Sequence, residues 1–189
     1  MNGIVDLHMH VVPCIDDGSQ SIEESMQMLK LAAEQGVTDV FCTSHNGCCK
    51  EDGERYMNAF IQLENAAEEA KINIKIHKGC ELLCSEEHID DIIYGLNIGS
   101  FSTLGNSKYV LTELHPDAEA GEVLTIIRAL AENGYKPIFA HMERANNITN
   151  LIVRLLIESG VFIQVNTFSF VDEADAKIRE RARELLRNK

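Results

Sequence analysis

The segment Asp6–His10 (DLHMH) places two histidines two residues apart near the beginning of the chain. Successive side chains of a β-strand point to opposite faces, so His8 and His10 are expected to point the same way, about 7 Å apart. Two imidazoles at this spacing can bind one divalent metal ion. The alternative interpretation is a pair of partly buried histidines at a strand end, and the other candidate ligands decide between the two.

Further histidine and glutamate residues lie at or near the ends of later apolar runs. These residues are His45, Glu81, Glu113 and His141. Each run has the length and composition of a strand, and in (β/α) barrels the active site lies at the carboxyl ends of the strands. Imidazoles and carboxylates that meet in one pocket suit Zn, Mn or Fe. The sequence therefore predicts a metal centre.

Two more polar groups have both a structural and a functional interpretation. The segment Asp16-Asp17-Gly18 is either a helix cap with a turn, since Asp-Gly favours turns, or the source of a metal ligand. Arg144, three residues after His141, is either one half of an ion pair on a helix surface or a clamp for two phosphate oxygens. The residues alone leave both choices open.

Short apolar runs alternate with stretches of helical spacing along the chain. The expected strands are 4–10, 37–45, 72–83, 109–114, 135–141 and 161–170, and the expected helices lie within 22–33, 56–67, 123–130, 148–155 and 174–185. Glycines at 36, 134 and 160 mark helix ends, and Ser21 with Glu24 forms a capping box. The alternation predicts an α/β fold with a mainly parallel sheet and helices outside it, in a single domain over residues 1–189.

Charge and cysteine content narrow the class of protein. The 189 residues include 17 Lys and Arg against 30 Asp and Glu, for a formal net charge of -13. Such a chain does not favour nonspecific binding to nucleic acid or to anionic membranes, and no apolar stretch approaches the ~18 residues of a membrane span. The six cysteines are expected to be reduced thiols. We therefore expect a cytoplasmic protein.

The order of these motifs resembles the PHP (polymerase and histidinol phosphatase) family over essentially the whole chain. The motifs are D-x-H-x-H, Asp-Asp-Gly, T-S-H, a lone Glu after a strand, and A-H-x-E-R. The pattern is more closely similar to that of the capsule-associated tyrosine phosphatases of mainly Gram-positive bacteria. The resemblance implies a distorted (β/α)7 TIM-like barrel holding up to three divalent ions, most often manganese or iron. The implied substrate is phosphotyrosine on a tyrosine kinase that controls capsular or exopolysaccharide synthesis.

Carried over by position, the resemblance also implies roles for individual residues. The implied metal ligands are His8, His10, Asp17, His45, Glu81, Glu113 and His141. Among them, Glu81 would bridge the first ion, bound by His8 and His10, and the second, bound by Glu113 and His141. Asp17 and His45 would serve the third. Arg144 would bind the phosphate, and together with Asp17 it is predicted to be catalytic, with a metal-activated hydroxide as the nucleophile.

The sequence departs from the family pattern at its end. The family continues to a further strand that ends in Asp-x-His, whereas this chain stops at Lys189 within an expected helix. We therefore expect a barrel that is incomplete at its C-terminus, with the first and third metal sites each lacking a ligand, and an open edge that favours a homo-oligomer. Two other functions stay open. One is a small-molecule phosphatase such as histidinol phosphatase, and the other is a domain that binds phosphoprotein without turnover.

Cys49 and Arg55 have the C-x5-R spacing of cysteine-dependent tyrosine phosphatases. The intervening loop carries three acidic side chains, which would repel phosphate and raise the pKa of the thiol. We therefore interpret this match as chance. A zinc site built from His45, Cys48 and Cys49 would need a partner set that the sequence does not offer.

Overall fold

The computed structural model describes residues 3–45 and 53–187, which form two compact units. Unit 1 contains Met1–Glu81 and Gly95–Ser107, and unit 2 contains Leu82–Tyr94 and Lys108–Lys189. The single domain expected over residues 1–189 stays a prediction.

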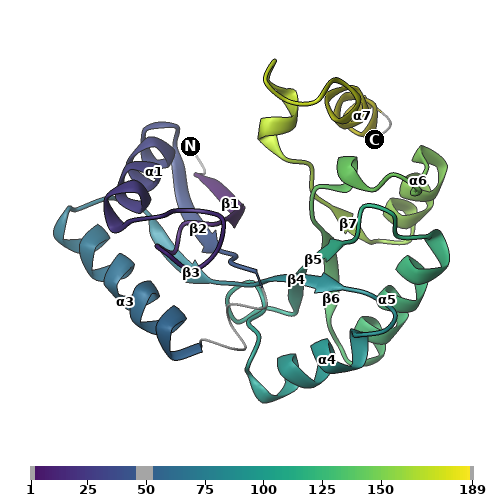
Figure 1. Ribbon diagram of the computed structural model, residues 1–189, viewed down its shortest axis with the longest axis horizontal. Helices are drawn as coiled ribbons and strands as arrows, with labels where there is room; N and C mark the ends of the chain where they lie inside the picture. Colours follow the sequence, from purple (N-terminus) through teal and green to yellow (C-terminus); the bar gives the residue numbers. More distant parts are fainter. Residues whose placement is uncertain (1–2, 46–52, 188–189) are drawn as a thin grey trace. The chain divides into compact units, whose positions relative to one another are not determined.

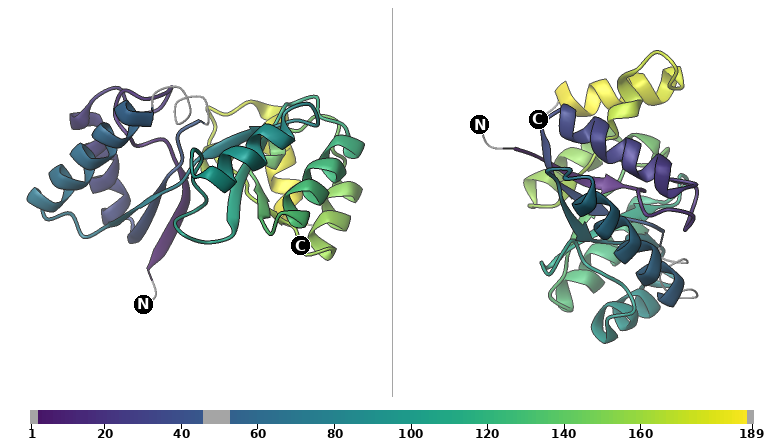
Figure 2. Two further views of the ribbon diagram at one scale, coloured as in Figure 1. Left: turned by 90° about the horizontal axis from the view of Figure 1, so that it is seen from below. Right: turned by 90° about the vertical axis from the view of Figure 1, so that its left-hand side faces the viewer.

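Unit 1 is a parallel sheet with two helices on one face. Strands β1 (Ile4–Met9), β2 (Val37–Cys42) and β3 (Lys75–Lys78) lie in the order β1-β2-β3, and both neighbouring pairs are parallel. Helices α1 (Ile22–Glu34) and α3 (Gly53–Glu69) lie side by side against this sheet (Figures 1 and 2). The expected strand–helix succession is thus present in this unit.

The core of unit 1 forms between the sheet and the helices. Leu29 of α1 and Phe60 and Leu63 of α3 are buried against Val40 and Cys42 of β2. Alternate residues of β2 face the helices because strand side chains have a period of two, and the helical residues share a stripe three or four positions apart. A fully buried Leu or Phe contributes about 1.5–3 kcal/mol. This core fixes the strands whose carboxyl ends carry histidines.

The predicted helix boundaries follow from local chemistry. The Ser21 hydroxyl accepts from the backbone N–H of Glu24 at 3.1 Å, which confirms the cap at the start of α1. The Glu24 carboxylate, however, accepts from the N–H of Gln20 at 2.7 Å, one residue before the cap. Gly36 follows the helix with a φ of +89°, a left-handed conformation that glycine adopts without a steric penalty.

Unit 2 contains the second sheet. Its order is β4 (Glu81–Cys84), β5 (Tyr109–Leu114), β6 (Lys136–Phe139) and β7 (Phe162–Ile163). The β5–β6 and β6–β7 pairs are parallel. Glu81 itself, the first residue of β4, falls in unit 1.

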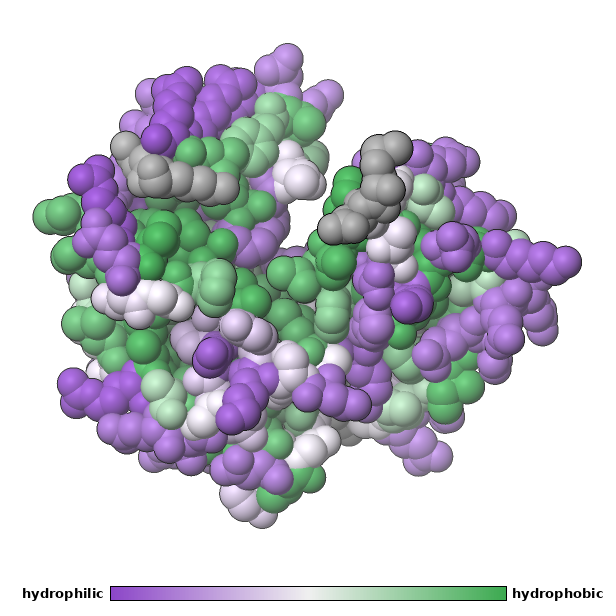
Figure 3. Space-filling model, turned by 180° about the vertical axis from the view of Figure 1, so that it is seen from behind, coloured by the Kyte–Doolittle hydropathy of each residue, from purple (hydrophilic) through white to green (hydrophobic). Residues whose placement is uncertain are grey.

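Helices and short 3-10 turns connect the strands of this half of the chain. They are α4 (Ile89–Ile98), α5 (Ala120–Glu132), η1 (Met142–Arg144), α6 (Asn150–Glu158), η2 (Thr167–Phe170) and α7 (Ala176–Arg187). Hydrophilic side chains dominate the surface of α7, at the upper left of Figure 3. None of the helices in the described part of the chain is long and apolar enough to cross a bilayer.

Two expected strands differ from the structure. The run 72–83 is two strands, β3 and β4, so Glu81 begins a strand and does not lie near the end of one. The break falls at Gly79, where a Cβ atom would lie 3.0 Å from the Thr43 side chain. The run 161–170 is strand only at Phe162–Ile163 and ends in the turn η2, because a buried carboxylate from another segment binds that turn. The α/β fold with parallel strands is confirmed, and closure into a distorted (β/α)7 barrel stays a prediction.

Candidate metal centre

Strand β1 carries His8, and His10 follows directly after the strand with its ring beside that of His8. Their ring centroids are 5.2 Å apart, and their Nε2 atoms are separated by 3.1 Å. Met9 points the other way and packs against the core of unit 1. The alternation of the strand thus brings the two imidazoles together, as the D-x-H-x-H spacing predicts.

Glu81 lies at the centre of three imidazoles. Its Oε2 atom is 3.2 Å from His8 Nε2, 3.0 Å from His10 Nε2 and 3.4 Å from His45 Nδ1. Backbone contacts position Glu81 next to His45. The Glu81 N–H donates to the Ser44 carbonyl at 3.1 Å, and Glu81 pairs with His45 in a parallel bridge. The Glu81 side chain is only 1% exposed. A buried carboxylate in this position must be compensated by cations or hydrogen bonds.

The separations between these donor atoms fit a shared metal ion. Ligand bonds of about 2.1 Å place neighbouring donors about 3.0 Å apart at right angles and about 3.4 Å apart in a tetrahedron. His8, His10 and Glu81 each offer one ligand atom, and these three atoms lie 3.0–3.2 Å from one another. Two nitrogens and one oxygen form the mixed set that Zn, Mn and Fe accept.

A second group of ligand atoms shares His10. Asp17 Oδ1 is 3.5 Å from His45 Nε2 and 3.7 Å from His10 Nδ1, and the ring centroids of the two histidines are 4.8 Å apart. One ligand atom from each of the three residues lies within 4.8 Å of the others. The Asp17 side chain is 81% exposed, so this group opens to solvent.

Asp16 belongs to this site, and the sequence alone leaves the Asp16-Asp17-Gly18 segment open between a turn and a metal ligand. Its Oδ2 atom lies 2.9 Å from His10 Nδ1. Burial alone would lower the pKa of His10, but the bonds to Asp16 and Glu81 outweigh it and raise that pKa to about 10. Burial would likewise raise the pKa of Asp16, yet His10 and two backbone N–H groups hold it below its usual range.

The predicted ligands Glu113 and His141 lie in unit 2. Glu113 is near the end of β5, and His141 follows β6. His141 Nε2 is 3.7 Å from Glu113 Oε1. His141 has a left-handed backbone, with a φ of +30°, and its N–H donates to the Gln164 side-chain oxygen at 2.8 Å. Unit 2 therefore brings one imidazole and one carboxylate together.

The rest of the A-H-x-E-R segment forms the turn η1. Arg144 is exposed at its end. Glu143 is buried, and its Oε1 atom accepts from the backbone N–H of Asn166 at 3.0 Å and from the Ser169 hydroxyl at 2.6 Å. We made no prediction for Glu143, because its partners lie 23 and 26 residues further along the chain.

A cysteine-dependent phosphatase mechanism, the alternative that the C-x5-R spacing suggests, finds no support in the described residues. Cys48 and Cys49 lie outside them, and the Arg55 guanidinium donates to the Cys14 carbonyl. Cys84 is buried, and burial with the nearby Glu113 charge raises its pKa to about 12. A thiol with this pKa stays protonated at neutral pH and is a poor nucleophile.

Comparisons with known proteins agree with the geometry. A family described as "Capsular polysaccharide synthesis, CpsB/CapC" matches residues 4–189. Tyrosine-protein phosphatase CpsB of Streptococcus pneumoniae is 29% identical over 97% of this chain and 77% of its own length. The putative tyrosine-protein phosphatase CapC of Staphylococcus aureus is 28% identical over 97% of this chain and 72% of its own length.

A solved structure shares the fold. It comes from the crystal structures of YwqE from Bacillus subtilis and CpsB from Streptococcus pneumoniae, which are described as unique metal-dependent tyrosine phosphatases. The likeness has a TM-score of 0.81 at 22% identity and covers 97% of this chain and 74% of the other. The predicted relationship to capsule-associated phosphatases is thereby confirmed, and the chain belongs to the CpsB/CapC family of capsular polysaccharide synthesis.

Proposed function

We propose that this protein is a metal-dependent phosphatase that hydrolyses phosphotyrosine on a protein. The observation that carries the proposal is the convergence of three imidazoles on the buried Glu81 carboxylate, at 3.0–3.4 Å. The names of the relatives support the reaction, since CpsB and CapC are tyrosine-protein phosphatases by name. The proposed substrate is a tyrosine kinase of capsular or exopolysaccharide synthesis.

The metal ligands follow from the donor sets. We assign His8, His10 and Glu81 to one ion and Asp17 with His45 to another, and we assign Glu113 and His141 of unit 2 as further ligands. Manganese is the proposed metal, because mixed imidazole and carboxylate sets suit it. When bound, such ions lower the pKa of water and neutralise charge on a phosphoryl group.

The chain's own side chains supply binding and orientation. Arg144 is exposed and carries a planar guanidinium, which can donate two parallel hydrogen bonds to phosphate oxygens. A chain with a net charge of -13 needs such local positive charge to bind a phosphoprotein. The 81% exposed Asp17 is accessible to solvent and to substrate. We therefore propose Arg144 as the phosphate-binding residue and Asp17 as the second catalytic residue.

We also propose a cytoplasmic location. Cys42 and Cys84 are buried free thiols, which suits a reducing compartment.

The test measures metal content and hydrolysis on the purified full chain. Manganese should stimulate hydrolysis of a phosphotyrosine peptide, and His10→Ala and His141→Ala should abolish it. His77→Ala is the matched control, because His77 pairs with Asp39 at 2.8 Å outside the cluster. Cys49→Ser should keep activity.

Three results would contradict the proposal. They are hydrolysis without bound metal, loss of activity in Cys49→Ser with retention in His141→Ala, and a preference for histidinol phosphate over the phosphopeptide. The last result would favour a small-molecule phosphatase. Metal binding and phosphopeptide binding without turnover would favour a noncatalytic binding domain.

A further inference from the structure

We infer that Asp16 is a positioning residue of the metal centre, and that its single carboxylate holds both His10 and His45 in place. The inference rests on the proposed function, because it concerns the ligands assigned there. It assigns a separate task to each member of the Asp16-Asp17 pair, which the sequence alone does not distinguish.

The contacts of Asp16 reach two ligand-bearing segments at once. Oδ2 lies 2.9 Å from His10 Nδ1 and accepts from the backbone N–H of His45 at 3.1 Å. Oδ1 accepts from the N–H of Gly18 at 3.1 Å, which closes the turn. The Asp16 side chain is 3% exposed. Three bonds to one buried carboxylate define its position, and charge-assisted bonds of this kind are about twice as strong as neutral ones.

Asp17 differs from its neighbour in every one of these respects. Its side chain is 81% exposed, and its contacts to His10 and His45 are 3.7 and 3.5 Å, longer than hydrogen bonds. Within residues 3–45 and 53–187, no backbone N–H binds Asp17 as those of Gly18 and His45 bind Asp16, so Asp17 is suited to be a ligand. Asp16 instead acts through the histidines.

The bond to Asp16 sets which nitrogen of His10 would face a bound metal ion. A metal-binding imidazole carries one proton, and Nδ1–H donation to the Asp16 carboxylate would keep that proton on Nδ1 and leave the Nε2 lone pair for the ion. His10 Nε2 is the atom that faces Glu81 Oε2 at 3.0 Å and His8 Nε2 at 3.1 Å. Carboxylates that accept from a ligating histidine in this way fix the ring and increase its basicity.

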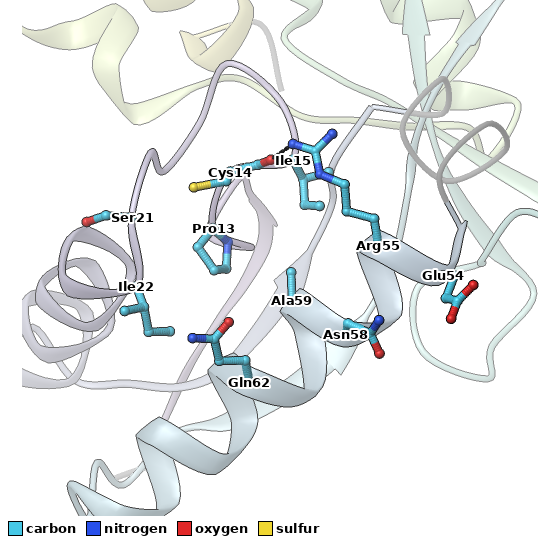
Figure 4. Close-up of a pocket in the computed structure, with 10 residues that line it drawn as sticks. All are labelled: Pro13, Cys14, Ile15, Ser21, Ile22, Glu54, Arg55, Asn58, Ala59 and Gln62. Carbon is cyan, nitrogen blue, oxygen red and sulfur yellow. Dashed lines mark hydrogen bonds between the residues drawn. The ribbon is translucent and has the colours of Figure 1, made fainter.

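The loop that carries Asp16 is braced by backbone bonds. Ser19 N–H donates to the His10 carbonyl at 3.0 Å, and Cys14 N–H donates to the Ser19 carbonyl at 2.8 Å. The loop also lines a pocket of about 710 Å³ against α3, where the Arg55 guanidinium points at the Cys14 carbonyl and donates to it (Figure 4). Asp16 is thus held in place by its own loop as well as by its partners.

The experiment compares three variants of the full chain. Asp16→Ala removes every contact, and Asp16→Asn keeps one acceptor oxygen without the charge. Asp39→Ala is the matched control, because Asp39 also pairs with a histidine, His77, at 2.8 Å in the same unit but outside the ligand groups. Affinity for Mn²⁺ and Co²⁺ is measured by titration, alongside the melting temperature of the metal-free protein.

The expected result is a graded loss of metal affinity. Asp16→Ala should bind Mn²⁺ about 10–100-fold more weakly than the parent, as for other carboxylates behind a metal-bound histidine. Asp16→Asn should fall between the two, and Asp39→Ala should keep the parent affinity. Unchanged affinity in both Asp16 variants would overturn the inference. If Asp16→Ala does not fold, a loss of affinity at an unchanged melting temperature in Asp16→Asn supports it.

An NMR measurement distinguishes a positioning role of Asp16 from a general contribution to the stability of the protein. In the Co²⁺-loaded parent, the Nδ1–H proton of His10 should give an NMR signal that the paramagnetic ion shifts and that exchanges slowly with solvent, because this proton is bonded to Asp16. The signal should disappear in Asp16→Asn or exchange much faster, whereas Asp39→Ala should keep it. A signal that persists unchanged in Asp16→Asn would contradict the inference while the proposed function stood. Absence of any metal binding in the parent would instead overturn the proposed function and the inference together.

Discussion

The two units place the same kinds of side chain at the carboxyl ends of their strands, but they hold them by different means. In unit 1, His8 lies in β1 where its pairing with β2 shifts register, His10 follows the strand, and Glu81 pairs with His45 beyond the end of β2. In unit 2, His141 has a φ of +30°, and the turn after it depends on the buried Glu143. The unit 1 histidines rely on the buried Asp16 carboxylate, whereas His141 relies on a left-handed backbone beside the buried Glu143.

The difference has an energetic side. A left-handed conformation costs a residue with a Cβ atom about 1–2 kcal/mol. Such strain persists only where the surroundings enforce it. Gln164 does so, since its side-chain oxygen accepts from the His141 N–H and its carbonyl accepts from the Met142 N–H at 3.0 Å. The left-handed backbone of unit 2 thus falls on the histidine itself, whereas that of the unit 1 loop falls on Cys14, with a φ of +59°.

The largest expected effect comes from removing the centre of the unit 1 cluster. Glu81→Ala should reduce phosphopeptide hydrolysis and Mn²⁺ affinity by at least about 100-fold. Loss of a carboxylate that only supports a metal ligand lowers metal affinity about 10–100-fold, and loss of a direct ligand should lower it more. Glu113→Ala is the counterpart in unit 2. Titration and steady-state kinetics measure both variants. Full activity in Glu81→Ala would show that the cluster is not the metal centre.

Glu143→Ala tests whether unit 2 depends on its buried carboxylate. The substitution leaves the Asn166 N–H and the Ser169 hydroxyl without their acceptor, at about 1–3 kcal/mol for each unsatisfied buried group. Urea denaturation should therefore show a lower free energy of unfolding. Glu173→Ala is the control, because Glu173 is exposed. Equal free energies of unfolding for Glu143→Ala and Glu173→Ala would show that Glu143 does not stabilise unit 2.

Glycine substitutions separate strain from function in the two units. His141→Gly should abolish activity and yet raise the free energy of unfolding by about 1 kcal/mol, because glycine accepts the left-handed conformation. His8→Gly should instead be less stable than His8→Ala by about 0.5–1 kcal/mol, since glycine weakens a strand. Thermal and chemical denaturation of the metal-free variants measure both. A loss of stability in His141→Gly would remove the proposed contrast.

The smallest effect concerns the Asp39–His77 pair. The bond from His77, followed by that from Thr38, lowers the pKa of Asp39. A lowered carboxyl pKa in the folded state contributes stability above the unfolded pKa of about 3.9, and this stability is lost as the pH falls through the lower folded value. Asp39→Asn should therefore lose slightly less stability than the parent on acidification below about pH 4. Parallel acid-unfolding curves would contradict this.

The sequence pattern predicted those strands, helix ends and side-chain positions that depend on local chemistry. The run at 109–114 has the bounds of β5, and the expected helix end at Gly36 has the predicted left-handed backbone. The convergence of His8 and His10 needed only the two-residue period of a strand. These features are set by neighbours along the chain.

What the sequence did not predict depends on distant partners. Asp16 binds the backbone of His45, 29 residues later, and Glu143 binds Ser169, 26 residues later. The break that makes Glu81 the first residue of β4 falls beside Gly79, where an added Cβ atom would lie 3.0 Å from the Thr43 side chain. No local pattern encodes contacts of this kind, since they form only when the segments pack.

Gly18 shows how a residue without a functional group can decide whether the centre exists. A Cβ atom at position 18 would lie 2.2 Å from the carbonyl oxygen of His10 and 2.4 Å from the His10 Cβ atom. Any side chain there would push apart the two ends of the loop that sets Asp16 against His10. One missense change at this glycine would therefore inactivate the protein while every ligand and every charged group stayed in the sequence. In a survey of natural or laboratory variants, position 18 should tolerate as few replacements as the histidines themselves.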